Sequence, residues 1–284
     1  VAALCGGIYN RAIQKRSGMK YMRLAIIGCM VMNREISHLV SESRHVVRVW
    51  WLRQGLHDTP DVLRTELQHA VDEIERENER LPESLRLEAV ILAYGLCSNG
   101  VIGLRSRALP VVVPRCDDCI SLFLGSADRY REMFQKLPGV YWYNTGWIEQ
   151  AFTPSKENYA RRRAEYAEEY GEENADYLME CTNNWMVNYR HCGYITCPLG
   201  EREGCEEYAR QAAADFGWEF TKVEGDMGYL DALVNGPWDD KRFMTCPPYS
   251  RIEADFSNRK FRSVPCEKED ASPAPDGERY RPVL

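Results

Sequence analysis

Nearly continuous apolar runs alternate with amphipathic stretches along the first half of the chain. The runs are rich in Val and Ile and predict strands buried on both faces at residues 24–28, 46–52, 89–94, 109–113 and 140–143. Between them, apolar residues recur at helical spacing at residues 34–43, 61–80 and 119–124. Strands that alternate with helices indicate an α/β fold, with a mostly parallel wound sheet and helices on both faces.

The same alternation returns after a long charged segment, residues 154–189, which is predicted to be helical with an interruption at Gly171. Strands are expected at residues 193–197, 218–223 and 243–246, and helices at 201–216 and 230–235. We therefore expect two Rossmann-like halves joined by a helical linker. The predicted boundaries are 1–18 for an N-terminal extension, 19–153 for the first half, 154–189 for the linker, 190–250 for a smaller second half and 251–284 for a partly irregular C-terminal tail.

Charge and hydropathy exclude two classes of partner. The formal net charge is -7, and a general nucleic-acid binder needs a cationic face. No run approaches the roughly 18 consecutive apolar residues of a membrane-spanning helix. We expect neither nucleic acid nor a membrane among the partners.

Cysteine is unusually frequent, with 11 residues among 284. The count is odd, the chain is long, and the pattern of residues 1–18 does not predict an export signal, so we expect a reducing cytoplasm. Thiols that stay reduced are either small buried residues or soft metal ligands and nucleophiles.

Soft ligands follow four successive predicted strands. Cys29 comes directly after the first strand and His57 just beyond the second, while Cys97 and Cys119 follow the third and fourth. Because the carboxyl ends of parallel strands meet at one edge of a sheet, we expect these side chains to lie together. Three thiolates with an imidazole suit tetrahedral zinc, and three thiolates with one open position suit an iron-sulfur cluster. The alternative is that each cysteine is a small buried residue at a crowded turn.

The loops around these cysteines supply candidates for binding a cofactor or substrate. Tyr94 and Gly95 precede Cys97 and Gly100 follows it, so that flexible backbone can approach a ligand closely. Arg115 can bind a carboxylate or phosphate, or form an ion pair with a neighbouring aspartate. The sequence contains no nucleotide-binding motif and no corrinoid-binding motif.

The segment Cys116-Asp117-Asp118-Cys119 has the spacing of a redox dithiol that opens a helix. Two carboxylates between the thiols oppose thiolate formation electrostatically. Metal binding is therefore the preferred interpretation, and dithiol exchange ranks below it.

Several short motifs carry a family resemblance across residues 24–248. They are Gly28-Cys29, Gly55-Leu56-His57-Asp58, Tyr94-Gly95-Leu96-Cys97 with Gly100, Pro114-Arg115 with Asp118-Cys119-Ile120, Leu124-Gly125-Ser126, Gly146-Trp147-Ile148-Glu149, Tyr170-Gly171-Glu172-Glu173-Asn174-Ala175, Gly217-Trp218 and Gly225-Asp226. With these motifs the chain resembles an uncharacterised domain-of-unknown-function family of anaerobic bacteria and methanogenic archaea, often encoded near corrinoid-dependent methyltransferases. The resemblance implies a context in C1 or corrinoid metabolism, with corrinoid proteins or methyltransferases as partners.

The family's pattern includes the positions of Cys29, His57, Cys97 and Cys119. It differs at Asp117, where histidine is frequent in the family, and at Cys116, where an aliphatic residue is usual, and both differences weaken a role for Cys116. The sequence thus predicts a cytoplasmic protein that binds an iron-sulfur cluster or zinc. Two alternatives stay open, a noncatalytic accessory or small-molecule-binding protein with a thiol-lined pocket, and thiol-dependent catalysis. Whether the protein is an enzyme is left undecided.

Overall fold

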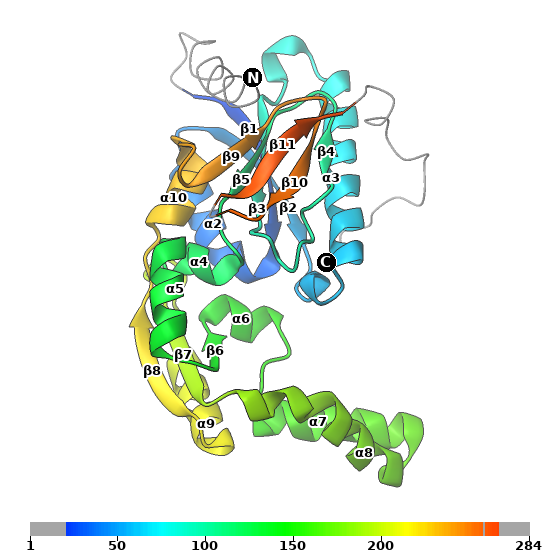
Figure 1. Cartoon of the computed structure of the whole chain (residues 1–284), viewed down its shortest axis with the longest axis vertical. Coiled ribbons are helices and arrows are strands. Elements are labelled where there is room, and N and C mark those ends of the chain that lie inside the picture. Colours follow the sequence, from blue (N-terminus) through cyan, green and yellow to red (C-terminus); the bar gives the residue numbers. More distant parts are fainter. Residues whose placement is uncertain (1–20, 258, 267–284) are drawn as a thin grey trace.

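A mostly parallel five-stranded sheet forms the centre of the computed structural model, which describes residues 21–257 and 259–266 (Figure 1). Its strand order is β2-β1-β3-β5-β9, and β9 alone in this sheet runs antiparallel to its neighbour. The strands are β1 (Arg23–Cys29), β2 (Val46–Leu52), β3 (Ala89–Ala93), β5 (Val111–Pro114) and β9 (Phe243–Cys246). The predicted α/β class with a mostly parallel sheet is confirmed at this level, while the arrangement as two Rossmann-like halves stays a prediction.

The inner strands explain the continuous apolar runs. All residues of β3 and β5 are buried, because these strands have neighbours on both sides and side chains packed on both faces. Helix α3 (Pro60–Arg80) buries Leu63, Leu67 and Val71 at helical spacing. At the edge of the sheet, β2 is only partly buried, which differs from the burial that its apolar run predicts.

A second, three-stranded parallel sheet has the order β6-β7-β8, with β6 (Val140–Tyr143), β7 (His191–Thr196) and β8 (Glu219–Glu224). Helix α9 (Cys205–Phe216) buries an alanine-rich face in the same small core as Cys192 and Tyr194 of β7. The strand pairing crosses the predicted boundaries between the halves. Residues 140–143 pair with the second sheet, and residues 243–246 return to the first.

The third sheet is antiparallel and joins β4 (Arg105–Ser106) to β10 (Ser250–Asp255) and β11 (Lys260–Pro265). It lies beside the central sheet in Figure 1, and Ile252 and Phe261 are buried in the same core as the inner strands. Part of the range predicted as a partly irregular tail therefore forms strands. Residues 1–18 and 267–284 lie outside the described residues.

Several further helices lie in the connections between strands. They are α2 (Asn33–Ser41), α4 (Cys119–Phe123), α5 (Ala127–Lys136), α6 (Thr145–Gln150) and α10 (Gly228–Asn235), with short 3-10 turns at Met30–Met32, Leu56–Asp58, Glu83–Leu85 and Asn184–Asn188. The predicted linker forms two long helices, α7 (Lys156–Tyr170) and α8 (Glu172–Asn183), which extend side by side away from the sheets (Figure 1). The predicted interruption at Gly171 is confirmed, because its φ of +87° suits glycine. Within the described ranges, no helix is long and apolar enough to cross a membrane.

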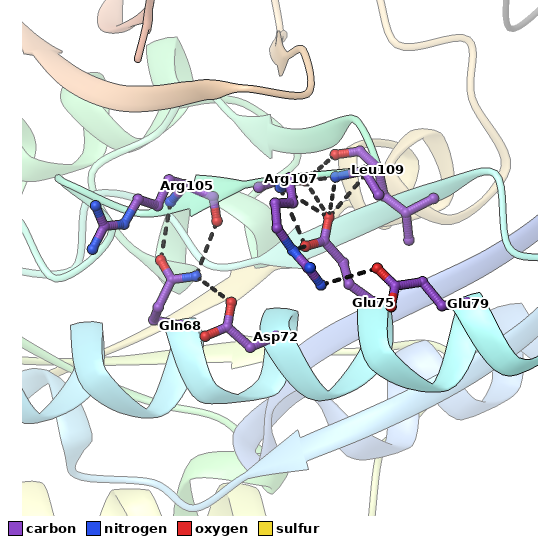
Figure 2. Close-up of polar contacts among 9 residues, drawn as sticks. Gln68, Asp72, Glu75, Glu79, Arg105, Arg107 and Leu109 are labelled. Carbon is purple, nitrogen blue, oxygen red and sulfur yellow. Dashed lines mark hydrogen bonds and ion pairs between the residues drawn. The ribbon is translucent and has the colours of Figure 1, made fainter. Parts of the chain in front are cut away.

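A buried carboxylate on α3 fixes the loop that leads into β5. Glu75 is 1% exposed and accepts hydrogen bonds from the Ser106 hydroxyl and from the backbone amides of residues 107–109. The Arg107 guanidinium bridges Glu75 and the exposed Glu79 (Figure 2). The segment that leads into β5 is therefore held by a polar contact with α3.

Candidate functional site

The carboxyl ends of β1, β3 and β5 bring three cysteine-bearing segments to one edge of the central sheet. Cys29 is the last residue of β1, Cys97 follows β3, and Cys119 opens α4 after β5. The strands are adjacent and parallel, in the order β1, β3, β5. The sequence-based expectation for these three segments therefore agrees with the strand topology.

Backbone hydrogen bonds join the second and third of these segments. The amide of Leu96 donates to the carbonyl of Cys116 over 2.9 Å, and the amide of Cys97 donates to the carbonyl of Asp117 over 2.8 Å. Gly95 permits this approach, because a Cβ at residue 95 would lie 2.7 Å from the carbonyl oxygen of Cys116. The two loops thus extend the pairing of β3 with β5 beyond the strands.

We expect Gly95→Ala to lower the free energy of unfolding by about 1–3 kcal/mol, because the new methyl group would press on backbone atoms that cannot rotate away. Urea denaturation followed by circular dichroism measures this change. Gly228→Ala is the control, since the nearest atom to its added Cβ is the flexible carboxylate of Asp226 at 3.0 Å. Equal stabilities of the two variants would contradict the close approach of the loops.

The turn that carries Cys97 has an unusual backbone. Cys97, Ser98 and Asn99 have φ angles of 43°, 57° and 67°, so three consecutive residues with side chains lie in the left-handed region. Such residues cost on the order of 1–3 kcal/mol each and concentrate at functional sites. The amide of Gly100 donates to the carbonyl of Cys97 over 3.0 Å and closes the turn. The strained turn that carries Cys97 therefore lies at the same edge of the sheet as Cys29 and Cys119.

The three thiols at this edge lie close enough to influence one another. Burial is the main cause that raises the pKa of Cys29, Cys97 and Cys119. Negative charge on Cys29 further raises the pKa of Cys97 and Cys119, and Cys97 acts on Cys119 in the same way. These thiols are therefore neutral near pH 7 unless a cation draws off their protons.

The Tyr94 side chain lies near all three cysteines. It is 4% exposed, and its buried hydroxyl makes no hydrogen bond of regular geometry. Burial raises the Tyr94 pKa, and the charges of Cys29, Cys97 and Cys119 raise it further. The Tyr94 hydroxyl interacts with the Cys29 thiol and has no other polar partner of regular geometry among the described residues, and such buried polar groups call for an explanation.

Asp118 places a negative charge near the thiols of Cys97 and Cys119. Its carboxylate caps α4 by accepting from the Ile120 amide over 3.0 Å, and it also accepts from the Tyr130 hydroxyl over 2.9 Å. Its negative charge raises the pKa of Cys97 and of Cys119. A reactive dithiol needs a lowered thiol pKa, so the environment of the CDDC segment opposes the redox interpretation. All ten described cysteines are free thiols.

His57 makes its ring and charge contacts with residues other than the cysteines. Its ring lies 5.9 Å from that of Trp147 on α6, and its Nε2 lies 3.5 Å from the carboxylate of Asp58. Within residues 21–257 and 259–266, no three His, Cys, Asp or Glu side chains form a group that could hold a metal ion. The predicted set of Cys29, His57, Cys97 and Cys119 is thus not assembled around one point.

Two residues predicted to bind a cofactor, Gly100 and Arg115, make structural contacts within the protein, and their predicted role stays a prediction. Gly100 packs against α3, where an added Cβ would lie 2.4 Å from Leu63 Cδ2. Arg115 is 7% exposed and pairs with Asp240 over 3.0 Å, whereas the sequence suggested Asp117 or Asp118. It also donates to the carbonyls of Phe243 and Phe261, which ties β9 to β11 beside the loop that carries Cys119.

Sequence reasoning missed a buried carboxyl at the contact between α2 and the loop after β7. Glu35 is fully buried, and neither of its carboxyl oxygens makes a hydrogen bond of regular geometry. A Cβ at Gly200 would lie 2.5 Å from Glu35 Oε1, so that loop presses directly on the carboxyl group. Burial raises the Glu35 pKa, although the nearby Cys197 thiol partly lowers it. No periodic signal marks this residue, since it occupies an apolar position of an amphipathic helix.

The Glu35→Gln variant should therefore be more stable than the original protein above neutral pH. The folded-state pKa of Glu35 is raised, so its contribution to stability is fully present below the unfolded-state pKa and is lost as pH rises through the folded-state pKa. The expected gain is about 1 kcal/mol or more at pH 8 and vanishes near pH 4. Urea denaturation at both pH values measures it, and an equal effect at the two pH values would contradict a buried, protonated carboxyl group.

Comparison with known proteins identifies a matching family, but no individual protein of known function. Residues 51–234 match the family described as "Protein of unknown function (DUF1638)". No curated protein and no solved structure matches the chain. Cys97 and Cys119 lie inside the matched region and Cys29 lies before it.

Proposed function

The chain belongs to the DUF1638 family, whose function is unknown, and we propose that it is a metal-binding protein in which Cys29, Cys97 and Cys119 hold an iron-sulfur cluster. One observation carries the proposal. Three reduced cysteines, Cys29 buried and Cys97 and Cys119 partly buried, lie at or beyond the ends of three adjacent parallel strands at one edge of the sheet, and their charges act on the buried Tyr94 hydroxyl. Cysteine thiolates are the usual ligands of such clusters.

A cluster is preferred here to a single zinc ion because of how the two bind their ligands. The four ligands of tetrahedral zinc must converge on one atom, and the described side chains form no such group. Ligands of a cluster bind different iron atoms and therefore lie farther apart around it. Three cysteines leave one iron with an open position, where a heteroatom of a substrate can bind. His57 is not needed for this arrangement.

The protonation of the thiols agrees with a site that forms only with its metal. Burial and the charge of Asp118 keep the thiols neutral in the free protein. The positive charge of iron favours the thiolate form, so cluster binding releases protons and weakens as pH falls. Hydrogen bonds and solvent exposure around the sulfurs tune the potential of a bound cluster, and the Tyr94 hydroxyl, which interacts with Cys29, is one donor for that purpose.

The proposed setting is cytoplasmic C1 metabolism. A cluster with one open position suits the transfer of electrons to a corrinoid, with corrinoid proteins or methyltransferases as partners. The sequence resemblance described above supports this setting.

A second candidate function is the binding of a small molecule without catalysis. The Tyr94 hydroxyl favours it, because among the described residues its only polar interaction is with the Cys29 thiol, and a ligand could accept a stronger hydrogen bond from it. In this case the same edge would form a thiol-lined pocket.

Anaerobic reconstitution distinguishes the two candidates. The protein is incubated with ferrous iron and sulfide, or with zinc alone, and bound metal and visible absorption are measured after desalting. We expect stoichiometric iron and sulfide with a brown colour, and no stoichiometric zinc. Cys181→Ser, which changes an exposed thiol on α8, is the control and should bind iron equally. Failure of the original protein to retain iron and sulfide would favour the thiol-lined pocket.

A further inference from the structure

A large pocket opens on the side of the central sheet where β9, β10 and β11 meet α5. Its volume is about 860 Å³, and its walls come from the first turn of α5, the loop between α10 and β9, and the turn between β10 and β11. The charged residues in its lining are Arg115, Arg131, Lys241, Arg242, Arg259 and Lys260, together with Asp128, Asp239 and Asp240. The volume is that of a site for a small organic molecule.

The pocket is positive although the whole chain is negative. Six cationic side chains face three carboxylates, while the chain has a formal net charge of -7. Asp117, which pairs with Lys260 over 2.6 Å, lowers the local excess from three positive charges to two. A cavity lined by one sign of charge raises the local concentration of ions of the opposite sign.

Two of these cations, Lys241 and Arg131, are available to a ligand. Lys241 is exposed, and its ammonium forms no ion pair with a carboxylate of the described residues. Arg131 pairs with Asp128 one turn earlier on α5, but both side chains are more than half exposed. Exposed pairs of this kind contribute little energy, and a guanidinium has five donors, so Arg131 can also bind an anion.

The start of α5 adds backbone donors to the same wall. Ser126 caps this ten-residue helix by accepting from the Arg129 amide over 3.1 Å. The amides of Ala127 and Asp128 precede the first helical hydrogen bond and line the pocket, where the helix dipole favours an anion. The carboxylate of Asp128 opposes this effect, so the helix strengthens the site only together with the cations.

The pocket is fixed by internal contacts before a ligand arrives. Arg115 donates to the carbonyls of Asp240 and Phe261 over 2.9 and 2.8 Å, and so joins two of the walls. Its donors are used within the protein, and it contributes charge to the pocket while other residues contact the ligand. Tyr229 forms an aromatic part of the lining, and its hydroxyl donates to the carbonyl of Arg242 over 2.7 Å.

We propose that this pocket binds a small organic phosphate, with the phosphoryl group between Lys241, Arg131 and the start of α5 and the organic part in the remaining volume of the pocket. Cations from separate elements match the two charges and three oxygens of a phosphoryl group better than the single charge of a carboxylate. The volume exceeds the need of inorganic phosphate alone. This site is separate from the cysteines, and its ligand does not depend on the presence of a cluster.

Phenyl phosphate is the minimal probe, titrated into the full chain and followed by NMR at low salt. Inorganic phosphate and benzoate test the organic part and the phosphoryl group separately. We expect phenyl phosphate to bind more tightly than either. Lys241→Gln and Arg131→Gln should each raise its dissociation constant about tenfold, the usual effect of losing one charge-assisted hydrogen bond.

Arg161→Gln on α7 is the matched control, because Arg161 is as exposed as Arg131 and pairs with Glu165 within its own helix. It should leave the dissociation constant unchanged. Circular dichroism confirms that each variant is folded, which we expect because both pocket residues are exposed. Absence of binding, equal binding of benzoate, or an equal loss in Arg161→Gln would overturn the proposal.

Discussion

Glu75→Ala is expected to lower the free energy of unfolding by about 3–5 kcal/mol. The carboxylate is buried and accepts from the Ser106 hydroxyl over 2.7 Å and from the Ala108 amide over 2.6 Å. Removing it leaves these donors, and the Arg107 guanidinium, without their buried acceptor (Figure 2). Urea denaturation of the two proteins at pH 7 measures the difference.

Glu79→Ala is the control for this prediction. Glu79 lies one turn further along α3 and pairs with the same arginine, but it is more than half exposed. Its loss should cost less than about 1 kcal/mol, as is usual for exposed ion pairs. Similar effects of the two substitutions would mean that the loop before β5 does not depend on the buried carboxylate.

Cys97→Ser is expected to abolish cluster binding and to remove the stability that the cluster provides. Binding that is confined to the folded state stabilises it, so the reconstituted original protein should exceed the variant by about 3 kcal/mol or more. Without iron and sulfide the difference should shrink, because the thiol is then a small, partly buried residue. Iron content and thermal unfolding, measured with and without reconstitution, test both parts.

Cys116→Ser provides the sharper control, since Cys116 is fully buried in the loop that precedes Cys119 and is absent from the proposed ligand set. This variant should lose some stability and keep its iron. Loss of iron from Cys116→Ser, or retention of iron by Cys97→Ser, would contradict the assignment of the ligands.

The central sheet was predictable because its inner strands are buried on both faces and so carry unbroken apolar runs. The strands β10 and β11 were not, because each buries only one face. Ile252 and Phe261 are fully or almost fully buried between charged neighbours, a pattern too short to distinguish from an irregular tail. Helix α5 did carry a signal, since Ser126 caps it and Tyr130 and Met133 pack on the core.

The candidate site was predictable where it depends on strand ends and not where it depends on distant contacts. The parallel order of β1, β3 and β5 places Cys29, Cys97 and Cys119 at one edge, and this placement does not depend on the conformation of the loops. His57 follows the edge strand β2, and its loop turns to Trp147, a contact across 90 residues that no local pattern encodes. The cations of the phosphate pocket are likewise scattered along the sequence and become neighbours only in the fold.

Iron and acid-labile sulfide, measured in protein purified without oxygen, test the central claim most directly. The account predicts about four of each per chain, the content of a [4Fe-4S] cluster, together with broad visible absorption. Substituting Cys29, Cys97 or Cys119 should remove both iron and colour. Colourless protein without iron, with its cysteines reduced and its fold intact, would contradict the proposal that this edge holds a cluster.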